Sequence, residues 1–110
     1  MKHITNANPI PVSGHPDIFK KVFVENGQIP SITQVATATF IPGQEVSEHK
    51  HDTMYEVFYI ISGKACFFVA GKEFEVGPGE CVVIEPGELH AQKNPFDENV
   101  TWVYFGVAVE

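Results

Sequence analysis

Short apolar runs separated by turn residues make up most of the chain from residue 20 onward. The runs are rich in β-branched and aromatic residues and are bounded by Gly, Pro, Asn and Asp, which is typical of strands. We expect strands over residues 20–24, 32–41, 56–61, 64–70, 72–76, 81–84, 89–93 and 100–109. No long stretch has the periodicity of an amphipathic helix. Many short strands with turns between them predict an all-β sandwich or barrel.

The first 19 residues differ from this pattern because they contain Pro9, Pro11, Gly14 and Pro16. We expect residues 1–19 to be irregular and either to wrap the barrel or to reach a partner. The chain has 110 residues, which is enough for one domain and too few for two separate cores. We therefore expect a single barrel domain over residues 20–110.

Composition and charge narrow the classes of function. The chain has 7 basic and 14 acidic residues and a formal net charge of −7, which argues against binding to nucleic acid. No apolar stretch is long enough to span a membrane, and the N-terminus lacks the apolar core of a signal peptide, so we expect a cytoplasmic protein. All basic residues are lysines. The bidentate arginine clamp common in anion sites is therefore excluded.

The two cysteines, Cys66 and Cys81, lie in apolar runs. We expect both to be small buried side chains without a disulfide bond, because the cytoplasm is reducing and no CxxC spacing suggests a zinc site.

The histidines carry the candidate chemistry. His49 and His51 are two residues apart, so on an extended segment their rings lie on the same face. Glu56 can join them only if the chain bends at residues 52–54, and His90 arrives from another part of the sheet after Pro86-Gly87. Imidazole and carboxylate ligands suit divalent transition metals better than Ca²⁺ or Mg²⁺. A His-x-His pair alone also fits polar residues at a strand end, so the spacing by itself leaves both readings open.

The glycines and prolines around these histidines resemble the two motifs of the cupin superfamily. The first motif, G-x5-H-x-H-x4-E-x6-G, is filled by Gly43, His49, His51, Glu56 and Gly63. The second, G-x5-P-x-G-x2-H-x3-N, matches at Gly79, Gly87, His90 and Asn94. One position departs, because Glu85 stands where the motif has proline and Pro86 follows it.

The resemblance implies a double-stranded β-helix, or jelly-roll barrel. It also implies that His49, His51, Glu56 and His90 bind one divalent transition metal, which could be Fe, Mn, Ni, Co, Cu or Zn. His3 and His15 lie outside both motifs, and we expect no ligand role for either.

Three classes of function remain open. The first is a metal-dependent oxygenase, isomerase or lyase, in which Glu56 could act as a general base. The second is a module that binds or senses a metal or small ligand without turnover. The third, a metal-free sugar epimerase of the kind some cupins are, is disfavoured by the missing arginine, as are thiol dioxygenases and sugar-phosphate isomerases. We favour the enzyme, and we expect a small ligand that is aromatic or enolisable and is neutral except where it meets the metal.

Strand parity and exposed apolar runs suggest the surroundings of the site. Phe58 and Ile60 should point inward with Glu56. The aromatic residues expected either at the rim of the pocket or in the core are Tyr55, Tyr59, Trp102 and Tyr104. We also expect a homodimer, with an interface drawn from residues 32–41, the face of residues 57, 59 and 61, or the N-terminal segment.

Overall fold

The computed structural model describes residues 1–109, which form ten strands and no helix. No helix among these residues could cross a membrane. The strands are β1 (Ile10–Val12), β2 (His15–Val24), β3 (Ile32–Phe40), β4 (Glu45–His49), β5 (Met54–Ser62), β6 (Ala65–Val69), β7 (Lys72–Val76), β8 (Cys81–Ile84), β9 (His90–Lys93) and β10 (Val100–Ala108).

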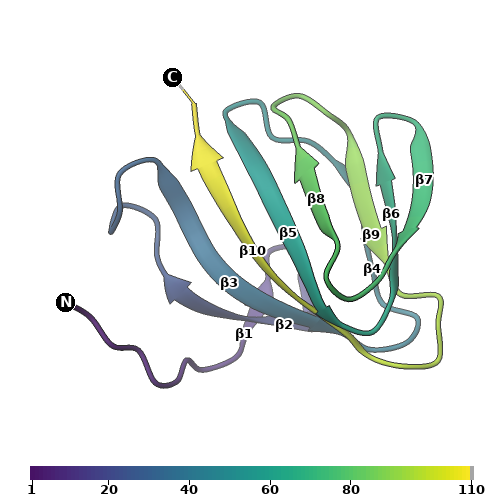
Figure 1. Ribbon diagram of the computed structural model, residues 1–110, viewed down its shortest axis with the longest axis horizontal. Helices are drawn as coiled ribbons and strands as arrows, with labels where there is room; N and C mark the ends of the chain where they lie inside the picture. Colours follow the sequence, from purple (N-terminus) through teal and green to yellow (C-terminus); the bar gives the residue numbers. More distant parts are fainter. Residues whose placement is uncertain (110) are drawn as a thin grey trace.

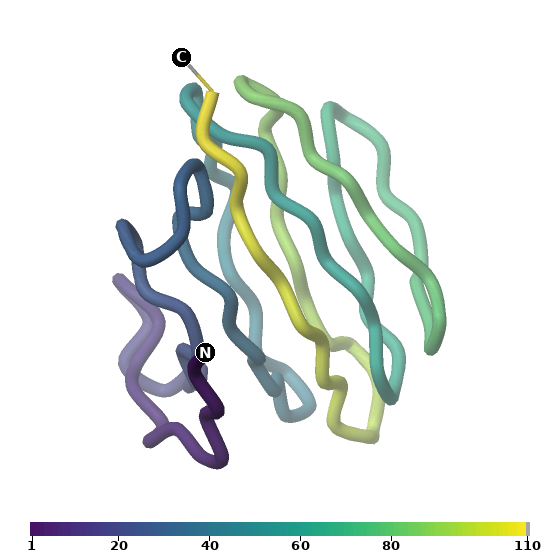
Figure 2. Tube along the Cα trace, turned by 60° about the vertical axis from the view of Figure 1, so that its left-hand side comes forward, coloured from purple at the N-terminus to yellow at the C-terminus, as the bar shows by residue number. Residues whose placement is uncertain are grey.

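The strands form two antiparallel sheets (Figure 1). One sheet has six strands in the order β1-β2-β3-β10-β5-β8, and the other has four in the order β4-β9-β6-β7. Figure 2 shows the two layers from another side, with the N-terminal hairpin at one edge. Many neighbours in each sheet are distant in sequence, as in a jelly roll. The all-β fold class is therefore confirmed.

The core fills the space between the two sheets. Residues 56, 58 and 60 of β5 point inward as their parity predicts, and Phe58 and Ile60 are buried. Trp102 of β10 packs against Phe40, with ring centroids 4.6 Å apart, and against Phe67, with centroids 5.6 Å apart. Side chains from both sheets thus meet around one tryptophan, and this apolar cluster closes the barrel beneath the site described below.

Three turns share one construction. Each has Pro-Gly at its centre, over residues 41–44, 77–80 and 85–88, and in each the backbone N–H of the fourth residue donates to the carbonyl of the first. In each, the fourth residue is Gln or Glu, and its side chain accepts a hydrogen bond from the backbone N–H of the first. The central glycines have φ between +84° and +89°, which suits type II turns. Each of these turns is therefore specified by the four residues that form it.

The prediction that residues 1–19 are irregular was wrong for residues 10–19. Strand β1 pairs with β2 in a hairpin, and β2 pairs with β3, so this segment extends the six-stranded sheet. The prediction was wrong because it took the prolines as evidence against a strand. Proline is tolerated on an edge strand, where its missing N–H leaves no neighbouring strand without a hydrogen bond. Strand β4 was also not predicted, since its mixed polar sequence shows no clear alternation.

The prediction for the cysteines was partly wrong. Both thiols are free, as expected, but Cys66 is only partly buried and Cys81 is exposed. On β8 the inward positions belong to Val82 and Ile84, so strand parity places Cys81 and Val83 on the outer face.

Candidate metal centre

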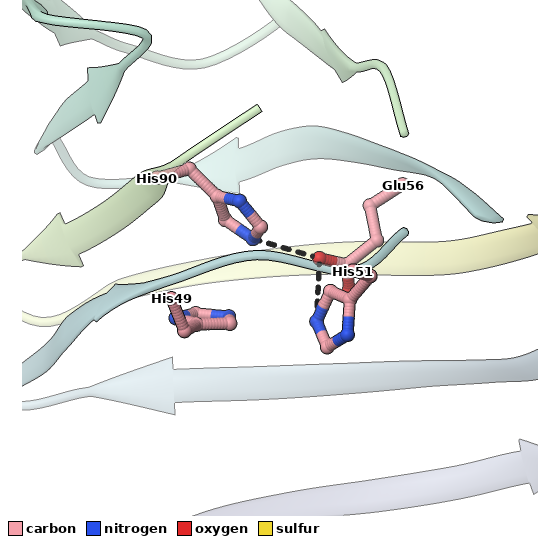
Figure 3. Close-up of side chains that lie close together, drawn as sticks. All are labelled: His49, His51, Glu56 and His90. Atoms are coloured by element: carbon pink, nitrogen blue, oxygen red, sulfur yellow. Dashed lines mark hydrogen bonds and ion pairs between the residues drawn. The ribbon is translucent and has the colours of Figure 1, made fainter. Parts of the chain in front are cut away.

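The four predicted ligand residues come together inside the barrel (Figure 3). His49 is the last residue of β4, His51 lies in the following loop, Glu56 points inward from β5, and His90 is the first residue of β9. One donor atom from each residue lies within 4.8 Å of the others. The carboxylate of Glu56 and the ring of His90 are buried, whereas His49 and His51 are half-buried on the open side.

The bend that Glu56 requires occurs at Asp52 and Thr53, between β4 and β5. This bend is fixed to other parts of the barrel. The N–H of Gly87 donates to the carbonyl of His51 over 2.8 Å, and the N–H of Val109 donates to the carbonyl of Thr53 over 2.8 Å. The predicted change of face between His51 and Glu56 is therefore confirmed, and His51 of the first motif is bonded to the Pro86-Gly87 turn of the second.

His90 is oriented by the turn that precedes it. The Glu88 side chain caps the turn at the N–H of Glu85, and the Glu88 carbonyl lies 3.0 Å from Nδ1 of His90. His49 is held in the same way, with Nδ1 2.8 Å from the Ser47 carbonyl. Because each Nδ1–H donates to a carbonyl, Nε2 of each ring is left to face the other ligands.

Asn94, the last residue of the second motif, has a structural role. Its amide donates to the carbonyls of Phe40 and Glu98, and its backbone exchanges hydrogen bonds with Gly43 and Gln44. Buried at 1% exposure, it joins the end of the second motif to the Pro42-Gly43 turn of the first rather than entering the site.

The donor set fits a divalent transition metal. Bonds of about 2.1 Å to one ion place neighbouring ligand atoms about 3–4 Å apart. Nε2 of His90 lies 3.0 Å from Oε1 of Glu56, and Nε2 of His51 lies 3.5 Å from the same oxygen. Small side-chain rotations therefore suffice to enclose an ion. Three imidazoles and one carboxylate suit Fe, Mn, Co, Ni, Cu or Zn.

Electrostatics favour different protonation states at two of the ligands. Burial lowers the pKa of His49, which keeps its ring neutral and ready to donate a lone pair. At His90 burial also acts to lower the pKa, but hydrogen bonds to Glu56 and to the Glu88 carbonyl outweigh it, so the pKa lies above its ordinary value. Nε2 of His90 and Oε1 of Glu56 thus face each other over 3.0 Å at the position where a cation would bind.

A cavity of about 390 Å³ opens onto the ligands. His49, His51 and Glu56 lie on its wall, and its apolar part is formed mainly by Phe40, Phe58, Trp102 and Tyr104. Burial, together with the nearby charge of Glu56, raises the pKa of Tyr104 to about 12, so its hydroxyl stays neutral at ordinary pH. Since four protein ligands leave two positions free on a six-coordinate ion, a small molecule in this cavity could reach the metal.

Comparison with known proteins identifies the family. The family model described as the cupin domain matches residues 36–106, which is more than half of the chain and includes all four candidate ligands. The chain is a cupin. The resemblance carried by its two motifs is therefore confirmed.

Two curated relatives of this cupin match in sequence. It is 34% identical over 53 residues to a Thermotoga maritima protein named "Oxalate-binding protein", covering 48% of this chain and 44% of that protein. It is 30% identical over 80 residues to an uncharacterized protein of Methanocaldococcus jannaschii, covering 73% of this chain and 57% of that one. The cupin thus matches about half the length of these relatives.

Solved structures support the fold. A predicted oxalate decarboxylase from Thermotoga maritima superposes with a TM-score of 0.84 at 20% identity, covering 94% of this chain and 92% of that one. A Cupin 2 conserved barrel domain protein from Salinispora arenicola superposes with a TM-score of 0.78 at 19% identity, covering 99% and 88%. At this identity the likeness shows the jelly-roll fold alone.

The walls of the site differ from the prediction at several positions. Tyr55 and Tyr59 are exposed on the outer face of β5 and do not line the cavity, because an odd offset from Glu56 turns them outward. Trp102 and Tyr104 do line it. His15 also reaches the cavity wall without joining the cluster of four.

Several polar residues of the cavity wall were missed, and two of them, Lys20 and Gln92, lie on inward-facing strand positions. Lys20 lies on the wall because it shares strand parity with the buried Ile18. The prediction that residues 1–19 are irregular leaves Ile18 outside any strand, so this parity could not be used. Gln92 shares the inward face of β9 with His90, and their spacing of two residues could have revealed it.

Proposed function

We propose that this cupin binds one divalent transition metal through His49, His51, Glu56 and His90 and is an enzyme acting on a small molecule that reaches the metal. The observation that carries the proposal is the convergence of these four donors beside a cavity of about 390 Å³, with His49, His51 and Glu56 on its wall. This volume lies near the lower end of the range for small-molecule sites. A ligand-accessible ion differs from a purely structural one, which is closed off by its protein ligands.

The proposed chemistry is that of an oxygenase, isomerase or lyase. When bound, the ion supplies Lewis acidity toward an oxygen of the ligand. Glu56 is the candidate general base, since its carboxylate is buried and faces the cavity. The aromatic walls exclude water from the reacting molecule and hold a flat or enolisable group by packing.

A second candidate function is binding without turnover. It is favoured by the relative named "Oxalate-binding protein", which matches over 53 residues. On this account the same four residues hold a metal that captures a small oxyanion, and Glu56 is a ligand without a role as a base.

Ligand screening on the metal-loaded protein separates these functions. The full chain, loaded with Fe(II), Mn(II), Ni(II) or Zn(II), is screened by thermal shift against diketones, catechols, flavonols, amino acids, sugar phosphates and oxalate. Ligands that stabilise it are then incubated with and without dioxygen and followed by mass spectrometry. Product formation that is lost in Glu56→Gln supports the enzyme, whereas stabilisation without any product supports the binding module. A protein that gains no stability from any metal contradicts both.

We also propose that the cupin forms a homodimer through the outer face of its six-stranded sheet. Strands β5 and β8 present Tyr59, Ile61 and Val83 there with 46%, 50% and 56% of their surface exposed. Adjacent apolar residues on one sheet face are typical of a surface covered by a partner. The inner faces of the two sheets already cover each other in the core. The apolar outer face therefore needs a separate partner, and a second copy of the chain is the simplest one.

A further inference from the structure

The cavity wall contributed by the six-stranded sheet carries a positive charge. Lys20 projects inward from β2, on the same face as Ile18 and Val22, and lines the cavity that contains His49, His51 and Glu56. Among residues 1–109 it is the one lysine on this wall. The strand over residues 20–24 was predicted, but the hairpin of β1 and β2 that brings Lys20 to this wall was not.

The ammonium group of Lys20 is held in place without being neutralised. Its Nζ donates to Oε1 of Gln34 over 3.1 Å, and Gln34 lies on the same wall. Lys50, Lys64 and Lys93 each pair with a carboxylate, but within residues 1–109 no carboxylate lies within 4.0 Å of Lys20. A part-buried cation with an amide as its only protein partner is well placed to receive an anion.

Gln92 adds an independent observation. It is 4% exposed, lines the cavity, and its Nε2 has no hydrogen-bond partner among the described residues. Buried amide groups are almost always paired, and this enclosed Nε2 has no bond to lose, so the Gln92 amide is free to turn over when a ligand oxygen binds. Rotation of the amide about its last torsion exchanges its N and O and turns the donor toward the cavity.

We propose that Lys20 and Gln92 form a carboxylate subsite, so that the metal cavity selects small dicarboxylates. One carboxylate meets the metal and the other accepts hydrogen bonds from Lys20 and Gln92. A divalent ion with three neutral imidazoles and Glu56 carries a net charge near +1, and Lys20 adds a second positive charge, which complements a dianion. The inference rests on the proposed function for its metal. It replaces the expectation of a ligand that is neutral away from the metal, which rested on the missing arginine.

The adjacent Lys21 provides a matched control. It carries the same charge but is exposed on the opposite face of β2, outside this cavity. The full-length protein is loaded with Zn(II), and its affinities for malonate and succinate are measured by calorimetry beside those for their monoamides, which keep one carboxylate and lose the second charge. Metal content is measured in every sample.

We expect the wild type to prefer each dicarboxylate over its monoamide. Lys20→Gln should weaken dicarboxylate binding about tenfold or more, as loss of a charged hydrogen bond does, and leave the monoamides nearly unchanged. Lys20→Met and Gln92→Leu should act in the same direction, and Lys21→Gln should match the wild type. Because each variant's zinc content and melting temperature are checked, a folding defect is recognised as such.

Equal dicarboxylate affinities in Lys20→Gln and Lys21→Gln, with zinc bound in both, would overturn the subsite and leave the metal site standing. A wild type that prefers the monoamides would do the same. A wild type that holds no zinc or other transition metal would instead overturn the proposed function, and the inference with it.

Discussion

Gly87 adopts a backbone conformation that few other residues tolerate, and it does so beside the candidate metal ligand His51. Its φ is +84°, its N–H holds the carbonyl of His51, and a Cβ at this position would meet only Oδ1 of Asp52, at 3.7 Å. The requirement for glycine is therefore conformational rather than steric.

We predict that Gly87→Val destabilises the protein far more than Glu85→Pro. A β-branched residue at positive φ costs about 2–3 kcal/mol. Glu85→Pro restores the residue of the motif and loses only the exposed hydrogen bond from the Glu85 N–H to the Glu88 side chain, a cost of about 1 kcal/mol or less. Urea denaturation of both variants measures the difference. Equal free energies of unfolding would refute this reading of the turn.

At this scale the sequence predicted the cluster of four candidate ligands but not the side chains around it. His49, His51, Glu56 and His90 could be predicted because their order and spacing are fixed by the turns between them. Lys20 could not, because its direction depends on a strand register that long-range pairing with β3 determines. The outward direction of Cys81 required the correct parity of β8, which an entirely apolar run does not reveal.

At the scale of the elements, two turn glycines are required for different reasons, one steric and conformational and the other conformational alone. Gly63, between β5 and β6, has φ +76° and packs against the backbone of the loop before β10, so that an added Cβ would overlap the Asn99 carbonyl oxygen and lie 2.8 Å from Cα of Val100. Gly71, between β6 and β7, has φ +85° and open space around it.

We predict that Gly63→Ala lowers the free energy of unfolding by about 3 kcal/mol or more, and Gly71→Ala by only about 1 kcal/mol. Both variants lose a favourable φ, but only Gly63→Ala also forces two backbone segments apart. Chemical denaturation with circular dichroism measures both. If the two substitutions cost the same, close packing of this turn on the loop before β10 contributes nothing to stability.

Most strands could be predicted because β-branched runs end at Pro-Gly or Gly turns whose chemistry is local. The boundaries were less certain where polar residues enter a strand. Strand β4 ends in the candidate ligand His49, and its other polar residues, Glu45, Ser47 and Glu48, are exposed rather than part of the core. Strand β1 contains a proline that only an edge position permits.

At the scale of the whole molecule, the apolar outer face of β5 and β8 predicts self-association. We expect the wild type to sediment as a dimer, and we expect Tyr59→Glu to raise the dimer dissociation constant by about a hundredfold, because it buries an unpaired charge. Ile29→Glu is the control, since Ile29 is similarly exposed but lies in the loop before β3. Analytical ultracentrifugation measures the dimer dissociation constants, and equal constants for the two variants would place any dimer interface elsewhere.

The central claim is that His49, His51, Glu56 and His90 bind a metal, and the metal content of the purified protein tests it most directly. Mass spectrometry should find about one divalent transition-metal ion per wild-type chain and little in His49→Ala or His90→Ala, as expected when a ligand of a four-ligand site is lost. His15→Ala, which alters the cavity wall outside the cluster, should keep its metal. Circular dichroism should show a folded barrel in each variant, and unfolding of the two ligand variants would make the metal structural. Wild-type metal levels in both His49→Ala and His90→Ala would contradict the account.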